Sequence, residues 1–313
     1  MNSLLSPAIA LLNRLSFSGK FALAAAISFI PIVYLLATAL PPFHADFKVA
    51  QHEAEGMAFI KTMQPVMINA QKHRGLSNAW LSGDTTAEAK VQKAAADMEI
   101  ALTALTNLSK QGGEDFGEGP ALQAITQKWA QLAAETSATP AAQSFAGHTT
   151  LVNDLLDLAS EIAYQSGLSL DPVADSYFLQ DSIVTQALPL IETLAKMRGK
   201  TAGILARKTI TPDEKAQVTA LTTLAQVYAK NLATNLKRAI EYNPPLGEAL
   251  TSLNAAAQDA IKASVALTAQ EAVNEGFSLT SADYFAAATQ PIDQTLKLVE
   301  ANDSALADLL NNR

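Results

Sequence analysis

The hydrophobic pattern of the chain begins with an apolar stretch from Phe21 to Leu40 that contains no charged residue. About twenty such residues are enough for a helix to cross a hydrocarbon core of about 30 Å. Pro31 lies inside the stretch, and membrane helices tolerate an internal proline better than soluble helices do. The sequence therefore predicts a transmembrane helix at residues 20–41.

The charges beside this stretch predict its orientation. Arg14 and Lys20 precede it, whereas the segment 41–46 that follows carries no basic residue. Cytoplasmic flanks are enriched in Lys and Arg, so residues 1–19 are expected in the cytoplasm and the rest of the chain on the far side. The alternative is a cleaved signal peptide, because Ala37-Thr38-Ala39 resembles a cleavage site. The apolar stretch is longer than usual for such a peptide, and both interpretations export the remainder.

After the apolar stretch, apolar residues recur with helical spacing, and no segment alternates convincingly as a β-strand would. Clusters of Gly, Pro, Ser, Thr and Asn separate the periodic segments. Thr211-Pro212-Asp213-Glu214 has the N-cap threonine, first-turn proline and early acids of a helix start. Eight helices are predicted, at residues 44–82, 86–111, 120–137, 141–167, 173–208, 212–242, 245–274 and 281–311.

Short connections between eight helices favour antiparallel packing of neighbours. The predicted fold class is therefore all-α, with an N-terminal transmembrane helix followed by two up-and-down four-helix bundle units. The first unit is expected at residues 42–168 and the second at 169–313.

An internal repeat supports the two units. Pro, Arg, Gly, a hydroxyl residue and Leu recur at an offset of 124 residues. The first copy is Pro65, Arg74, Gly75, Ser77 and Leu81, and the second is Pro189, Arg198, Gly199, Thr201 and Leu205. A proline inside a helix costs about 3 kcal/mol or more, and glycine about 1 kcal/mol relative to alanine. Either the pair marks a kink and a close helix crossing, or it opens a space into which the arginine points.

The repeated arginine is the strongest candidate for a binding residue. The chain has six arginines among its 22 basic residues, so arginine is used sparingly. Its planar guanidinium group suits carboxylate, nitrate or phosphate oxygens. Pairing of each arginine with an Asp or Glu of a neighbouring helix is the structural alternative, and the sequence leaves both open.

Composition and charge exclude several functions. The net charge is −8, and residues after the first twenty hold 20 basic and 30 acidic side chains, a net charge of −10 that disfavours nucleic-acid binding. There is no cysteine, which excludes disulfides, thiolate metal sites and cysteine nucleophiles.

Catalytic and metal-binding patterns are also missing. None of the four histidines has the spacing of a metal ligand, and His73 is expected on a solvated helix face. No nucleotide-binding or nucleophile motif occurs. We therefore expect neither an enzyme, nor a metal, nor a cofactor.

The residues around the first repeated arginine resemble a known family. Gln71 to Ser77, QKHRGLS, is similar to the Q-K-E-R-G-L-S signature of nitrate- and nitrite-sensing helical domains. The resemblance implies that arginines bind the anion between helices, here Arg74 and Arg198. Arg238 would join them if the fold brings it near, and Tyr177 and Gln180 are weaker candidates. His73 replaces an acid of the signature, which leaves the identity of the ligand open.

Two further segments resemble proteobacterial methyl-accepting chemotaxis proteins and related sensor kinases. Residues 11–21 are similar to the opening of these receptors, and residues 170–181 to a motif in the middle of their extracytoplasmic regions. The resemblance implies an inner-membrane protein with a periplasmic sensor domain, a homodimer, and a second membrane helix soon after Arg313. Cytoplasmic signalling proteins would be reached only through a region that this chain lacks.

Two functions remain open from the sequence. The first is the sensing region of a transmembrane chemoreceptor or other signal transducer, which binds a small solute such as nitrate and signals by helix movement. The second is a membrane-anchored periplasmic scaffold that binds a partner protein and no small ligand. The scaffold predicts that intramolecular acids neutralise both arginines.

Overall fold

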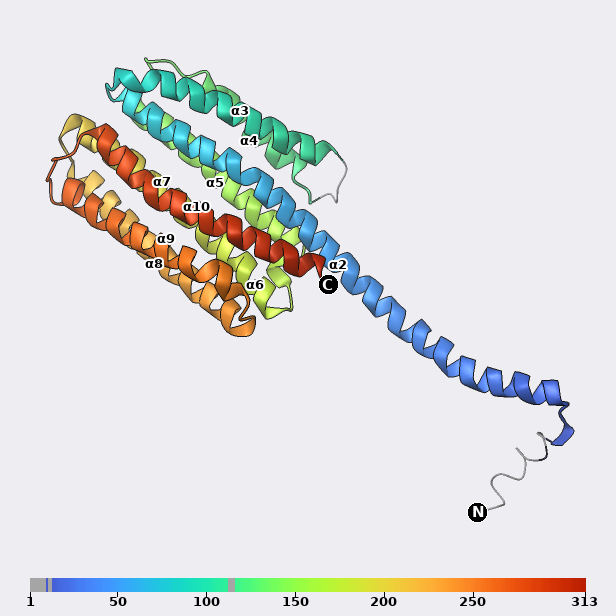
Figure 1. Ribbon diagram of the computed structural model, residues 1–313. Helices are drawn as coiled ribbons and strands as arrows, with labels where there is room; N and C mark the ends of the chain where they lie inside the picture. Colours follow the sequence, from blue (N-terminus) through green and yellow to red (C-terminus); the bar gives the residue numbers. More distant parts are fainter. Residues whose placement is uncertain (1–9, 11–12, 112–115) are drawn as a thin grey trace. The chain divides into compact units, whose positions relative to one another are not determined.

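The computed structural model describes residues 10, 13–111 and 116–313, except for the side chains of 39–46, and these ranges contain helices and no β-strand (Figure 1). The all-α prediction is confirmed. The elements in chain order are α2 (Phe17–Leu81), η1 (Thr85–Ala87), α3 (Glu88–Lys110), α4 (Gly119–Ala133), α5 (Ala141–Gln165), η2 (Leu168–Leu170), α6 (Ala174–Asp181), η3 (Ser182–Ala187), α7 (Leu188–Arg207), α8 (Pro212–Tyr242), α9 (Leu246–Thr268), η4 (Ala269–Val273) and α10 (Ser281–Asn311).

The predicted helix boundaries agree closely with these elements. The turn before α8 forms the capping box expected from its sequence, because Thr211 and Glu214 each accept a hydrogen bond from the other's backbone N–H. The predicted helix 173–208 is interrupted by η3, a π-helical segment directly before Pro189. A π turn is a common way to accommodate a local irregularity in a long helix.

One boundary prediction is wrong. The first bundle helix does not begin at His44, because α2 runs without a break from Phe17 to Leu81. Pro41 and Pro42 precede the predicted start at His44. A proline inside a helix removes a backbone hydrogen bond and crowds the preceding turn, yet here the helix continues through both. The chain forms two compact units, residues 1–50 and 51–312, which are described separately.

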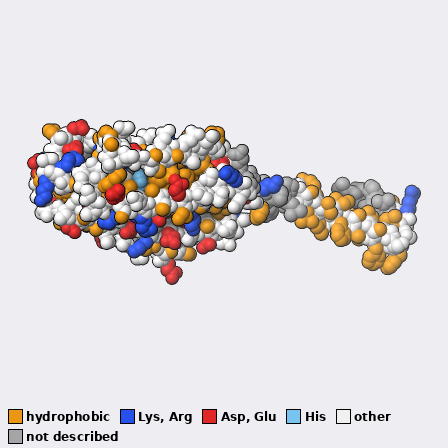
Figure 2. Space-filling model, turned by 90° about the horizontal axis from the view of Figure 1, so that it is seen from above, with side chains coloured by type: hydrophobic (Ala, Val, Ile, Leu, Met, Phe, Trp, Pro, Cys, Tyr) orange, Lys and Arg blue, Asp and Glu red, His pale blue; other side chains and the backbone are white. Residues whose placement is uncertain are grey.

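The first unit contains the apolar part of α2. Residues Phe17–Thr38 have a mean hydropathy of 2.2 and form a helix long and apolar enough to cross a membrane. Their large apolar side chains, among them Phe29, Val33 and Leu36, are exposed, and Figure 2 shows many apolar side chains along this helix. A membrane span is thus compatible with the structure, and its orientation stays a prediction.

The second unit is a bundle of antiparallel helices. In its first half α3 packs on α4 and α4 on α5; in its second half α7, α8, α9 and α10 pack in a closed ring, with α6 against α8 (Figure 1). Hydrogen bonds join α2 to α5, α7 and α10. A single hydrophobic core cluster contains residues from both halves, for instance Trp129 and Leu298. The division at residue 168 therefore stays a prediction.

The two repeated glycines lie where α2 crosses α7. A Cβ atom on Gly199 would lie 3.6 Å from the Cα of Gly75 and 3.0 Å from Cε2 of Phe145. A Cβ atom on Gly75 would lie 2.9 Å from Cε2 of Phe285. Only glycine leaves room for two helix backbones and two aromatic rings at this spacing. The close crossing considered from the sequence is therefore present.

Larger side chains at the crossing are expected to destabilise the protein. Gly75→Leu or Gly199→Leu should each lower the free energy of unfolding by roughly 1–3 kcal/mol, because overpacking displaces the rings or the helices. Urea unfolding of the full chain in detergent measures the change. Gly119→Ala is the control, because a Cβ atom there meets no described atom within 4 Å. Unchanged unfolding of both leucine variants would contradict the tight crossing.

Candidate functional site

The crossing of α2 and α7 buries two guanidinium groups. Arg74 on α2 is 0% exposed and Arg198 on α7 is 4% exposed. Burial and then the neighbouring charge of Arg74 lower the pKa of Arg198 to about 10. Arg198 therefore remains cationic at neutral pH, and the like charge of Arg74 lies close enough to repel it.

Each arginine contacts one phenylalanine ring and one threonine hydroxyl. Arg74 stacks on the ring of Phe145 at 5.0 Å and its Nη1 donates to Oγ1 of Thr149 at 3.1 Å. Arg198 stacks on the ring of Phe285 at 4.3 Å and its Nη1 donates to Oγ1 of Thr289 at 2.9 Å. The arrangement therefore occurs twice, once with α5 and once with α10.

A second sequence repeat lies behind this arrangement. Phe145 and Thr149 are four residues apart on α5, and Phe285 and Thr289 are four residues apart on α10, 140 residues later. Each threonine also donates to the carbonyl oxygen of its phenylalanine, at 2.8 and 2.7 Å. The signal Phe-Ala-x-x-Thr is present twice in the sequence and was missed in the sequence analysis.

The two halves differ at one acidic residue. Glu192, which is 2% exposed, accepts from Arg74 through both carboxylate oxygens, from Nη1 at 2.6 Å and from Nη2 at 2.9 Å. Gln71 also donates to it at 3.0 Å, and Nζ of Lys196 lies 3.2 Å away. The residue that corresponds to Glu192 in the first copy of the repeat is Ile68. Among the described residues, Arg74 thus forms hydrogen bonds with a buried carboxylate and Arg198 does not, although Glu192 attracts Arg198 through space.

Arg198 has no hydrogen bond to a carboxylate within the part of the chain that the structure describes. Asp293 attracts it only through space and is exposed to solvent. The Nε atoms of both Arg74 and Arg198 are buried and have no described hydrogen-bond partner. Arg74, Arg198, Lys196 and Glu192 together carry a net charge of +2, and the two buried Nε–H groups have no acceptor among the described residues, which is unusual for buried donors.

His73 and His148 form a buried pair beside Arg74, so the expectation of a solvated His73 is wrong. His148 Nδ1 lies 2.8 Å from the Ser144 carbonyl oxygen, which makes this nitrogen the donor. Its Nε2 therefore accepts from Nδ1 of His73 at 2.7 Å. Burial lowers the pKa of His73 to about 4, and burial together with the His73 charge lowers that of His148 to about 3. Helical periodicity alone did not reveal that α5 covers His73.

The structure does not bring the three other candidate residues to the arginines. Gln180 is buried on α6 and precedes Arg198 by 18 residues, which is roughly 25 Å along a helix. Tyr177 lies edge-on against Phe178, and Arg238 stacks on the same ring at 5.5 Å. The condition that the fold place Arg238 near Arg198 is not met. A binding role of Tyr177, Gln180 or Arg238 stays a prediction.

Comparison with known proteins identifies the family. Residues 65–309 match the sequence family described as nitrate and nitrite sensing. The chain belongs to this nitrate- and nitrite-sensing family. The match includes both arginines and the helices that surround them.

The fold of this family member also resembles a solved structure. The structure of the NasR transcription antiterminator superposes with a TM-score of 0.64 at 16% sequence identity, over 90% of this chain and 75% of that one. At this identity the similarity establishes the shared helical fold. No curated protein matches the chain.

No group of three or more acidic residues or histidines suited to a metal ion occurs in residues 13–111 and 116–313. The family description names sensing, and the site contains the charged hydrogen-bond donors of Arg74 and Arg198.

Removing Arg74 is expected to destabilise the sensor domain strongly. Arg74→Met leaves Glu192 buried without its main partner and should cost about 3–5 kcal/mol of unfolding free energy. Arg74→Met combined with Glu192→Met should recover much of that loss. Urea unfolding of the single and double variants measures the coupling. A loss below about 1 kcal/mol for the single variant would show that the pair is not a structural requirement.

The histidine pair predicts acid sensitivity of the fold. Both pKa values lie below the ordinary 6.5. The contribution of the two neutral histidines to the free energy of unfolding is therefore complete above pH 6.5 and is lost as the pH falls toward 4. The slope is up to about 1.4 kcal/mol per pH unit for each histidine. The measurement is the free energy of unfolding at pH values from 7 to 4. The double variant His73→Met, His148→Leu should show a smaller dependence of this free energy on pH, whereas the control His52→Gln should show the same dependence as the wild type. An unchanged slope in the double variant would contradict this role.

Proposed function

We propose that residues 51–312 bind nitrate or another small anion at the crossing of α2 and α7, with Arg198 as the principal ligand and Arg74 beside it. One observation carries the proposal: Arg198 is buried and cationic, and no described carboxylate forms a hydrogen bond with it. A buried charge that lacks a counterion costs several kcal/mol, and a bound anion would remove that cost.

The geometry of a guanidinium group suits a planar oxyanion. Two adjacent N–H groups donate in parallel to two oxygens, and such charge-assisted hydrogen bonds are about twice as strong as neutral ones. Each arginine has a buried Nε–H without a described acceptor. Phe285 shields one face of the Arg198 guanidinium, so an anion is expected at its edge.

Glu192 determines how strongly the cluster attracts an anion. It already occupies both Nη atoms of Arg74, so Arg74 contributes mainly its residual field and its free Nε–H. The like charge of Glu192 also opposes an incoming anion. The proposed site is therefore asymmetric, with Arg198 binding the ligand and Arg74 held in place by an internal carboxylate.

Within the whole protein, we propose that this domain is the ligand-sensing region of a transmembrane signal transducer. Anion binding would favour one packing of α2 against α7, and a small helix shift is a common way to signal. The apolar part of α2 would lie in the inner membrane, with residues 1–19 in the cytoplasm and the helical domain in the periplasm. A homodimer, and contact with cytoplasmic signalling proteins through a region beyond this chain, complete the proposal.

A membrane-anchored scaffold that binds a partner protein is the second candidate. The Arg74–Glu192 pair favours it, because a scaffold needs its buried arginines neutralised within the chain. Arg198 disfavours it, because the same neutralisation is missing in the second copy. Anion binding therefore separates the two candidates.

Calorimetric titration of the full chain with nitrate, in detergent and at constant ionic strength, tests the proposal. Arg198→Gln should weaken binding about tenfold or more, since a hydrogen bond to a charged group is worth ~1.5–3 kcal/mol. Glu192→Gln should strengthen binding, because it removes the opposing carboxylate. Arg238→Gln is the control and should leave binding unchanged.

Three results would decide against the site. Wild-type protein that binds neither nitrate nor nitrite favours the scaffold. Equal binding by wild type and Arg198→Gln excludes Arg198 as the ligand. If Arg238→Gln weakens nitrate binding as much as Arg198→Gln does, the anion site would be assigned to α8.

A further inference from the structure

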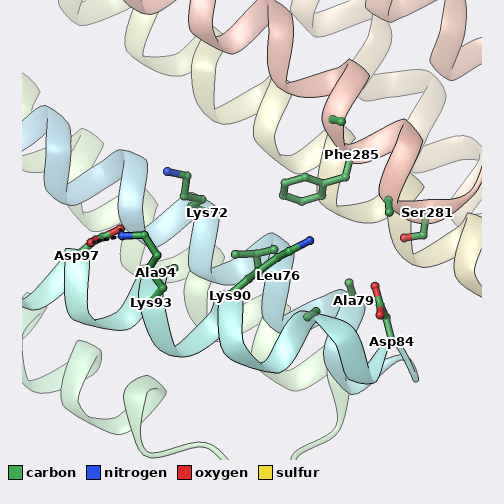
Figure 3. A pocket seen from close by; sticks show the side chains of 13 residues that line it. Lys72, Leu76, Ala79, Asp84, Lys90, Lys93, Ala94, Asp97, Ser281 and Phe285 are labelled. Carbon is green, nitrogen blue, oxygen red and sulfur yellow. Dashed lines mark hydrogen bonds and ion pairs between the residues drawn. The ribbon is translucent and has the colours of Figure 1, made fainter.

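A cavity of about 380 Å³ lies between α2, α3 and α10, and Phe285 forms part of its wall. Figure 3 shows Phe285 of α10 pointing toward Leu76 of α2, with Ala94 of α3 among the other apolar walls. Pockets of this volume hold small organic molecules, and apolar walls with a few polar groups are typical of them.

Cationic side chains line the same cavity. Lys93 is paired with Asp97, whose carboxylate lies 3.2 Å from its Nζ (Figure 3). Lys72 and Lys90 also line the cavity, and neither has a hydrogen bond or ion pair among the described residues. The cavity thus combines apolar walls with two unpaired ammonium groups.

The internal repeat supplies a matched cavity for comparison. A second cavity, of about 550 Å³, is lined by Lys196, Lys200 and Phe145, at positions equivalent to Lys72, Leu76 and Phe285. There the cations have partners: Lys196 lies 3.2 Å from Glu192, and Lys200 donates to Gln217 at 2.7 Å. Of these two cavities, the one beside Phe285 is therefore the one whose lining includes lysines without a described partner.

We propose that the cavity lined by Lys72, Lys90 and Phe285 is a second ligand site, which takes a small carboxylate with an apolar or aromatic body. The body would pack against Phe285, Leu76 and Ala94, and the carboxylate would pair with the lysine ammonium groups at the cavity wall. Nitrate does not fit this description, because it has no apolar body to cover the walls.

The site is placed to influence the arginine cluster. The ring of Phe285 lines the cavity and also stacks on Arg198 at 4.3 Å. A ligand that restrains this ring also restrains the guanidinium group. This coupling rests on the proposed anion site, whereas binding of the carboxylate does not.

Calorimetric titration of the full chain in lipid nanodiscs with benzoate and with hexanoate tests the proposal, and benzamide serves as the uncharged comparison. Benzoate should bind at least about tenfold more tightly than benzamide, because charge-assisted contacts to the lysines are lost in the amide. The double substitution Lys72→Gln, Lys90→Gln should weaken benzoate binding by a similar factor.

Two alanines at equivalent positions provide a matched pair of variants. Ala286→Leu fills the cavity beside Phe285, and Ala146→Leu fills the other one. Both alanines are exposed on helices, so both variants should fold. Nonspecific uptake of benzoate by the nanodisc lipid is the same for the two variants and cancels in the comparison. Benzoate binding should fall about tenfold in Ala286→Leu and stay unchanged in Ala146→Leu.

Several outcomes would overturn the proposal. Benzoate and hexanoate that do not bind, or a benzoate affinity equal to that of benzamide, exclude a carboxylate site. Equal effects of Ala286→Leu and Ala146→Leu exclude this cavity. Benzoate binding that survives Ala286→Leu but is lost in Arg198→Gln assigns the carboxylate to the arginine cluster; failure of nitrate binding alone leaves the second site intact.

Discussion

The close crossing of α2 and α7 is the constraint on which the rest of the domain depends. Gly75 and Gly199 allow the two backbones to approach, and the rings of Phe145 and Phe285 fill the space on either side. The residue before each glycine is then forced into the interior, which explains why two arginines are buried. Their desolvation would be prohibitive without stacking and hydrogen bonding, and Thr149 and Thr289 supply part of that compensation.

The repeat makes the domain nearly symmetric in its contacts, and its chemistry breaks that symmetry. Position 192 holds a glutamate, and the equivalent position 68 holds an isoleucine. That difference neutralises Arg74 and leaves Arg198 cationic. The two cavities beside Phe145 and Phe285 differ in the same way. Lys196 in the first cavity has an acidic partner, and Lys72 in the second has none among the described residues. One half of the domain is thus internally balanced, and the other half presents positive charge.

Much of this architecture could be predicted from the sequence, and particular residues show where prediction stopped. Periodicity and turn residues gave the helices, and the repeat identified Arg74 and Arg198 as an exceptional pair. The predicted helix start at His44 was wrong, because local sequence does not show whether a helix continues through two prolines. His73 was misplaced because its burial depends on α5, seventy-five residues away. Residue type and motif were the reasons for choosing Tyr177, Gln180 and Arg238. Neither reason indicates how far a residue lies from Arg198 in the folded chain.

The asymmetry at Glu192 has a consequence for stoichiometry. A duplicated arrangement of arginine, phenylalanine and threonine has the elements of two equivalent anion sites in one domain. In the proposed function, the carboxylate of Glu192 occupies the guanidinium group of Arg74 and would leave one anion site at the crossing of α2 and α7. A response that depends on one such site would rise with anion concentration in a simple hyperbolic way, and a single acidic side chain would determine that behaviour.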